Sequence, residues 1–137
     1  LSPSVHAVVA ARLGRMDDAA RYFRKSALVD LGGDYKAVSG GTFIGGIHTA
    51  ACAGTWQAAV RGFGGLRTDE ERLGLDPRLP AGWDRLAFSV VRHGRRLHVE
   101  VRPDAVALHA DAANDGEMPV RLPEARLELA PGQRHVA

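Results

Sequence analysis

A long apolar segment made largely of small residues, residues 47–63, constrains this chain more than any other feature. Alanine and glycine recur along it, so a helix built from this segment is slim and lets neighbouring backbones approach closely. The larger apolar side chains fall together on one side: Cys52, Trp56, Val60 and Phe63. Because such a helix is apolar nearly all round, we expect it to be buried, with Cys52 as a small buried hydrophobe.

Two shorter helices are predicted before this segment. The apolar residues of the first recur at the spacing of one helix face: Val5, Val8, Val9 and Leu13. Gly14 can adopt the left-handed conformation that ends a helix. The second helix begins near Asp17 and Asp18, whose carboxylates suit the positive end of the helix dipole. Its predicted buried stripe consists of apolar residues at helical spacing: Met16, Ala19, Ala20, Phe23 and Ala27.

Three helices, one of them apolar on every side, cannot close a hydrophobic core by themselves. We therefore predict that residues 1–65 are the last helices of a larger helical body, and that the chain is a C-terminal piece. Separated from that body, the helices would expose large apolar faces, which drives association. We expect a homo-oligomer, or a complex with the remainder of the helical body. Residues 32–46 are rich in glycine and predict a long loop that is functional or disordered.

The second half of the chain, residues 66–137, shows the two-residue alternation that is typical of strands. Strands are predicted over residues 85–92, 96–101, 105–109 and 126–129. His93 and Gly94 predict a short hairpin loop between the first two. Several short strands at this spacing favour an antiparallel sheet or sandwich. The fold class is therefore α+β, with a helical part over residues 1–65 and a β domain over residues 66–137.

Composition and charge exclude several functions. The 18 basic and 16 acidic residues give a formal net charge of +2, and only 6% of residues are aromatic, so a nucleic-acid surface is not expected. A single cysteine excludes a disulfide framework within the chain. No apolar run reaches the roughly 20 residues that span a bilayer, so we expect no membrane association and a cytoplasmic location. The histidines of the β half lack the paired spacing of a metal site: His93, His98, His109 and His135.

Four separated motifs resemble glycoside hydrolase family 65, which includes the maltose, trehalose and kojibiose phosphorylases. The longest covers residues 45–66 and contains the run Gly46-Ile47-His48-Thr49. The others lie at residues 1–6, 18–23 and 75–88, and all four stand in the family's order and spacing. The resemblance extends over most of the chain up to about Val101.

The resemblance implies a fold and a reaction. The fold would be the last helices of an (α/α)6 toroid followed by a small antiparallel β domain. The reaction would be inverting phosphorolysis of an α-glucosidic disaccharide to a sugar 1-phosphate, with inorganic phosphate as co-substrate and no other cofactor. The family's general acid matches nothing in this sequence, so we expect the catalytic residue upstream, no catalytic residue in this chain, and no activity from the chain alone.

The same resemblance names the phosphate contacts. His48 corresponds to the histidine of the family's glycine-isoleucine-histidine motif, flanked here by Gly46, Ile47 and Thr49, and Ser2 remains from its serine-rich loop. Physical chemistry is consistent with this, because the first N–H groups of a helix lack intrahelical partners and bind anions readily. An imidazole donor would add a charge-assisted hydrogen bond.

Two alternatives stay open at this point. The family commonly has a glutamate where this chain has Gly45, so a hydrolase of the same clan that uses water is one alternative. A non-catalytic structural or carbohydrate-binding module is the other, in which His48 caps a helix or is buried and hydrogen-bonded. We expect Trp56 and Trp83 to be core anchors; contact with carbohydrate is the alternative for either ring if it is exposed.

Overall fold

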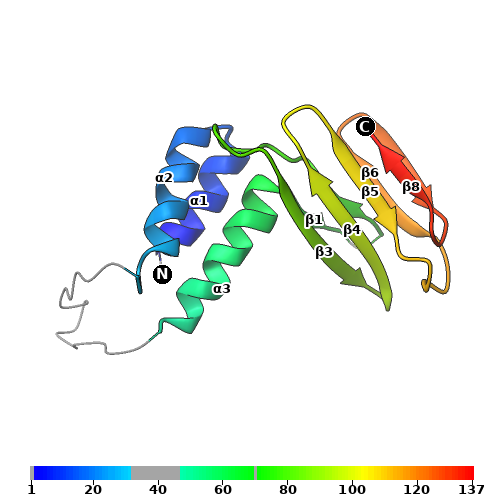
Figure 1. Cartoon of the computed structure of the whole chain (residues 1–137), viewed down its shortest axis with the longest axis horizontal. Coiled ribbons are helices and arrows are strands. Elements are labelled where there is room, and N and C mark those ends of the chain that lie inside the picture. Colours follow the sequence, from blue (N-terminus) through cyan, green and yellow to red (C-terminus); the bar gives the residue numbers. More distant parts are fainter. Residues whose placement is uncertain (1, 32–46, 70) are drawn as a thin grey trace.

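Helices occupy the first part of the chain and strands the second, as the α+β prediction requires (Figure 1). The structure is a computed structural model that describes residues 2–31, 47–69 and 71–137. The predicted loop over residues 32–46 lies outside the described residues, and so do Gly45 and Gly46 of the phosphate motif.

The first two helices form a hairpin. α1 (Ser2–Arg12) and α2 (Met16–Ala27) lie side by side and are joined by a three-residue turn (Figure 1). Gly14 has a φ of 74°. Its N–H donates to the Ala11 carbonyl at 3.0 Å, and the Arg15 N–H donates to the Ala10 carbonyl at 2.9 Å. This pair of bonds is the Schellman arrangement that satisfies the last carbonyls of a helix, which confirms Gly14 as its end.

The predicted buried face of α1 is wrong. Val5, Val9 and Leu13 are 63%, 48% and 69% exposed, whereas the buried residues of the helix are small: Ser4, Ala7, Ala10 and Ala11. The reason is close packing, because the neighbouring helices approach the face on which the side chains are shortest. On α2 the prediction holds better, since Ala19 is fully buried and Phe23 packs against the same cluster.

The slim apolar segment forms α3 (Thr49–Gln57), which continues as a π-helix, η1 (Ala58–Phe63). A Cβ on Gly54 would lie 2.8 Å from the Ser4 Cβ, so α3 contacts α1 where neither helix carries bulk. Val60 and Phe63 are buried as predicted. Cys52 and Trp56 are exposed, Trp56 to 56%, so their predicted burial is wrong. Among the described residues, the faces toward α1 and α2 and the carboxyl end of this helix are covered.

The second part of the chain contains two sheets. Their strand orders are β1-β2-β6-β7 and β3-β4-β5-β8. The bounds are β1 (Arg67–Thr68), β2 (Leu73–Gly74), β3 (Leu86–Arg92), β4 (Arg95–Val101), β5 (Val106–Ala110), β6 (Met118–Leu122), β7 (Ala125–Leu129) and β8 (Arg134–Val136). Side chains from both sheets share one buried cluster, which includes Leu73, Leu97, Leu108, Met118, Val120 and Leu129.

The four predicted strands are present as β3, β4, β5 and β7. His93 and Gly94 both have positive φ, 49° and 80°, as a two-residue hairpin turn between β3 and β4 requires. The pairing departs from the antiparallel prediction at one place among the described strands, where β2 runs parallel to β6. Strands β1, β2, β6 and β8 were not predicted, and β1 and β2 are only two residues long.

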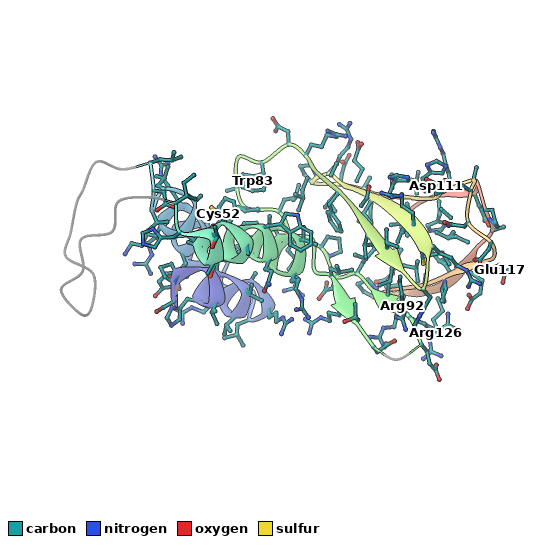
Figure 2. The ribbon with its side chains drawn as sticks, turned by 90° about the horizontal axis from the view of Figure 1, so that it is seen from below. Cys52, Trp83, Arg92, Asp111, Glu117 and Arg126 are labelled. Carbon is teal, nitrogen blue, oxygen red and sulfur yellow. The ribbon has the colours of Figure 1, made fainter. Side chains whose placement is uncertain are left out.

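An aromatic cluster joins the helices to the β domain. Phe23 of α2, Phe63 of η1 and Trp83 meet edge to face, with ring centroids 5.2–5.4 Å apart. Trp83 is therefore a core anchor, as predicted, and Figure 2 shows it beside the helices, far from Asp111 and Arg126. Each such pair contributes about 0.5–1.5 kcal/mol beyond the area it buries, so the cluster holds the two parts together.

The turn after η1 leaves no room for a side chain at Gly65. Its φ is 62°, and a Cβ there would lie 2.7 Å from the Asp76 nitrogen and closer still to the Asp76 carbonyl. Gly82 has a similar φ of 80°, but nothing lies within 4 Å of its Cβ position. Alanine substitutions at the two glycines therefore distinguish the cost of left-handed backbone strain from the cost of steric clash.

We expect Gly82→Ala to lower the free energy of unfolding by about 1–2 kcal/mol through left-handed backbone strain alone. Gly65→Ala adds overpacking and should cost about 1–3 kcal/mol more. Urea denaturation of the two variants measures the difference. Equal losses would show that the turn relaxes around the new methyl group, contrary to this description.

Candidate functional site

His48 stands at the amino end of α3, where the sequence placed it. It is the residue before the first helical position, with φ of −78° and ψ of 86°. Its carbonyl accepts the Ala51 N–H at 2.8 Å and the Cys52 N–H at 3.1 Å, so its main chain starts the helix. The His48 side chain does not cap α3, which leaves the imidazole to other partners.

Asp30, which lies just beyond the carboxyl end of α2, contacts His48. The His48 main-chain N–H donates to Asp30 Oδ2 at 2.8 Å, and the imidazole Nδ1 contacts Asp30 Oδ1. The two side chains are 14% exposed for Asp30 and 29% for His48. One carboxylate therefore binds both the main chain and the ring of the same histidine.

The charge state of Asp30 follows from this contact. The hydrogen bond with the His48 side chain holds the pKa of the Asp30 carboxyl below its ordinary value, although desolvation opposes it. The His48 main-chain N–H lowers this pKa further. Asp30 is thus a carboxylate at neutral pH, an acceptor with no proton of its own to donate.

The helix packing fixes this pair. The Thr55 hydroxyl of α3 donates to Ser26 Oγ of α2 at 2.8 Å, and Ser26 is buried. Together with the contact of Gly54 on Ser4, this bond sets how far α3 slides along its neighbours. The start of α3 consequently lies next to the end of α2, and Asp30 meets His48.

The other residues of the predicted phosphate site are only partly accounted for. Ile47 is 73% exposed, and Thr49 is exposed in the first turn of α3. Ser2 opens α1 and is exposed; the amino ends of α1 and α3 lie at the same end of the helical layer (Figure 1). Gly46 lies outside the described residues.

Sequence reasoning missed Asp30. It precedes His48 by 18 residues, with the glycine-rich stretch between them, and no local period connects the two. The only available signal was a carboxylate three residues after Ala27, the last predicted buried residue of the second helix. That position is indistinguishable from a solvated loop residue until α2 and α3 are packed together.

Histidines also meet on the β domain. His98 stacks on its cross-strand partner His109 with ring centroids 5.5 Å apart. Its two ring nitrogens contact Ser89 Oγ at 2.8 Å and Asp111 Oδ2 at 3.2 Å.

Within the described ranges, no group of three or more His, Cys, Asp or Glu side chains is arranged to hold a metal ion. Nor is any helix there long and apolar enough to cross a membrane.

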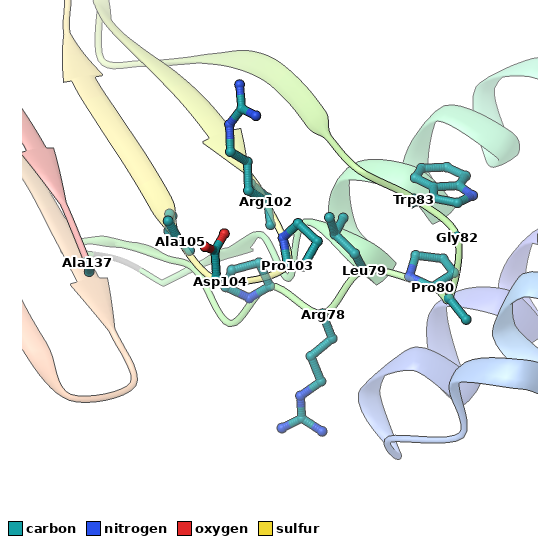
Figure 3. Close-up of a pocket in the computed structure, with 14 residues that line it drawn as sticks. Arg78, Leu79, Pro80, Gly82, Trp83, Arg102, Pro103, Asp104, Ala105 and Ala137 are labelled. Carbon is teal, nitrogen blue, oxygen red and sulfur yellow. The ribbon is translucent and has the colours of Figure 1, made fainter.

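A hollow of about 600 Å³ lies between the loop over residues 77–83 and the turn from β4 to β5. Figure 3 shows that Arg78 and Arg102, two of the residues lining it, point away from each other. The charged groups of this hollow do not converge on one point. The Asp30–His48 pair, with a helix amino end beside it, is the better candidate for an anion site.

Comparison with known proteins agrees with the fold and the motif. The structure is similar to that of a candidate kojibiose phosphorylase from the human microbiome, with a TM-score of 0.79 and 27% identity over 98% of this chain and 19% of that one. The sequence is 47% identical over 108 residues to the 1,2-alpha-glucosylglycerol phosphorylase of Bacillus selenitireducens. It is 41% identical over 108 residues to the kojibiose phosphorylase of Halothermothrix orenii. Each of these two sequence matches covers 79% of this chain.

Two family profiles match successive parts of the chain. Residues 1–57 match the glycosyl hydrolase family 65 central catalytic domain, and residues 66–129 match the glycosyl hydrolase family 65 C-terminal domain. A helical layer carrying a candidate anion site and packed on a small β domain thus matches two domains of a carbohydrate-active enzyme family. The chain belongs to glycoside hydrolase family 65. It spans 13–14% of the length of the two curated relatives named above.

We expect Asp30→Asn to lower the thermal unfolding midpoint at neutral pH and to lose that effect in acid. Because the folded-state pKa of Asp30 is lowered, its contribution is present above the ordinary pKa of an aspartate. It is lost as the pH falls through the lowered folded-state value. Melting curves of both proteins from pH 7 to pH 3 measure this. Asp17→Asn, at an exposed position on α2, is the control and should change little.

A midpoint for Asp30→Asn that equals the parent's at pH 7 would show that the contact contributes nothing to the fold. A deficit that persists unchanged to pH 3 would mean that the carboxylate charge is not its source.

Proposed function

We propose that this chain is the C-terminal part of an inverting disaccharide phosphorylase and supplies the phosphate side of its active site. The observation that carries the proposal is the placement of His48. It stands at the amino end of α3, held by a carboxylate, in a family 65 chain whose relatives are named as phosphorylases. In this proposal the chain has no activity by itself, because the acid that protonates the leaving sugar lies elsewhere in the enzyme.

The helices support a place in a larger helical body. α1 exposes Val5, Val9 and Leu13, and α3 exposes Trp56. We infer that these helices are the last of an (α/α)6 toroid, and that the remainder of the toroid covers their apolar faces. A homo-oligomer would cover the same faces in a chain studied alone. The β domain packs on the helices through Phe63 and Trp83 and supports them from the other end.

The reaction assigns a definite task to this site. Phosphate bound before α3 attacks the anomeric carbon from the face opposite the glycosidic oxygen. The bond from that carbon to the glycosidic oxygen breaks, a bond to a phosphate oxygen forms, and the acid's proton goes to the leaving sugar. The products are a sugar 1-phosphate of inverted configuration and a free sugar. The positive end of the α3 dipole and the His48 imidazole offset the phosphate charge and orient it.

The relatives suggest the substrate class. Several of them are named kojibiose phosphorylase, alpha,alpha-trehalose phosphorylase or 1,2-alpha-glucosylglycerol phosphorylase, and two others are named only as glycosyl hydrolases. We propose an α-glucosidic disaccharide or a close analogue as substrate, with inorganic phosphate as co-substrate and no other cofactor. Partners in this proposal are these two small molecules and the rest of the enzyme, and no nucleic acid or membrane.

The test uses the full-length enzyme, incubated with candidate α-glucosides and inorganic phosphate, and measures release of sugar 1-phosphate. We expect His48→Ala to lower phosphorolysis by about 100-fold or more, as loss of a preorganised donor does at other active sites. His6→Ala is the control, since His6 is exposed and its ring is tilted against that of Tyr22, with centroids 5.2 Å apart.

Undiminished phosphorolysis in the His48→Ala enzyme would remove His48 from the phosphate site. Release of free sugar from every α-glucoside without any dependence on phosphate would instead identify a hydrolase of the same clan.

A further inference from the structure

We propose that Asp30 is a positioning residue for phosphate: it holds the His48 ring by Nδ1 and thereby presents Nε2 as the hydrogen-bond donor. The inference rests on the proposed function, because it concerns the same phosphate. It concerns a residue that neither the family motif nor the sequence pattern singles out.

The geometry restrains the histidine at two points. Asp30 Oδ2 accepts the His48 main-chain N–H at 2.8 Å, and Asp30 Oδ1 contacts the ring Nδ1. Because one carboxylate binds both groups, the ring cannot rotate about its side-chain bonds without losing a contact. Asp30 is itself only 14% exposed, so water competes weakly for its oxygens. The ring therefore has one favoured orientation before any ligand arrives.

The direction of the hydrogen bond defines the protons on the ring. A carboxylate can only accept, so Nδ1 carries a hydrogen when it bonds Asp30. An ionised phosphate oxygen is an acceptor as well, so Nε2 donates to it when Nε2 carries a hydrogen. An imidazole with hydrogens on both nitrogens is a cation, and Asp30 compensates the charge of that form. In that form the ring offers Nε2–H to an anionic acceptor while Nδ1–H stays on Asp30.

The carboxyl end of α2 also acts on the His48 ring. Asp30 follows the carboxyl end of α2, and that end carries the negative part of the helix dipole. The His48 ring therefore lies between the negative end of α2 with Asp30 and the positive end of α3. The positive end of α3 attracts the anion, while Asp30 holds the ring from the side of α2.

The substitution Asp30→Asn isolates the ring contact. An asparagine side chain keeps one oxygen that can accept the His48 main-chain N–H, but its amide nitrogen cannot accept from Nδ1. Asp30→Glu restores the carboxylate on a longer side chain. Asp17→Asn removes an exposed carboxylate of α2 and serves as the matched control.

In the full-length enzyme, we expect Asp30→Asn to raise the KM for inorganic phosphate about 10- to 100-fold, the effect of one charged hydrogen bond. The KM for the disaccharide should stay within about twofold. Asp30→Glu should recover part of the phosphate affinity, and Asp17→Asn should match the parent. Combined with His48→Ala, Asp30→Asn should add nothing, because its effect passes through the same ring.

The outcomes separate the two proposals. If His48→Ala impairs phosphate use and Asp30→Asn does not, the role of Asp30 is wrong and the proposed function stands. If His48→Ala has no effect, the proposed function of this site fails first. Equal rises in both KM values, or losses that add in the double variant, would show that Asp30 has only a structural role.

Discussion

The close approach of α3 to α1 is the constraint on which the rest of this structure depends. Gly54 of α3 faces Ser4 of α1. Gly62 of η1, which continues α3, faces Ala7, Val8 and Ala11 of α1. At both places there is room for at most a methyl group between the helices. Helices that pack on small residues have little freedom to slide or rotate. The packing of α3 against α1 therefore fixes the position of the amino end of α3. It begins beside the end of α2, and this juxtaposition creates the Asp30–His48 pair.

The other end of the same helix joins the β domain. η1 carries Phe63 into contact with Phe23 and Trp83, and the chain then turns through Gly65, where the Asp76 main chain occupies the space of a side chain. The two ends of one slim helix thus serve different purposes. Its amino end presents an imidazole to a candidate ligand, and its carboxyl end is fixed to a sandwich with its own core. Support at the second end holds the first in place.

Much of the fold was predictable because local periods survive in it. The two-residue alternation located β3, β4, β5 and β7, and the His93-Gly94 turn located their first hairpin. The buried face of α1 was not predictable from hydrophobicity, since close packing selected Ala7 and Ala11 over Val5 and Val9. The parallel pairing of β2 with β6 was not predictable either, because it joins residues far apart in the sequence and involves only the two residues of β2.

One residue of the candidate site could be predicted from the sequence and the other could not. His48 could be placed from its own neighbourhood, because a glycine pair before an apolar helix is a local signal. Asp30 could not, because its meaning depends on the packing of two helices separated by the glycine-rich stretch. Cys52 and Trp56 were misjudged for a related reason: their apolar character is real, but no element of the described structure covers them.

The central claim is that the His48 ring, oriented by Asp30, contacts phosphate. A crystal structure of the full-length enzyme grown with inorganic phosphate tests it most directly. The account predicts a phosphate oxygen within hydrogen-bond distance of His48 Nε2, in front of α3, with Nδ1 still on Asp30. A phosphate bound elsewhere in the active site, or a His48 ring turned away from Asp30 when phosphate is bound, would contradict it.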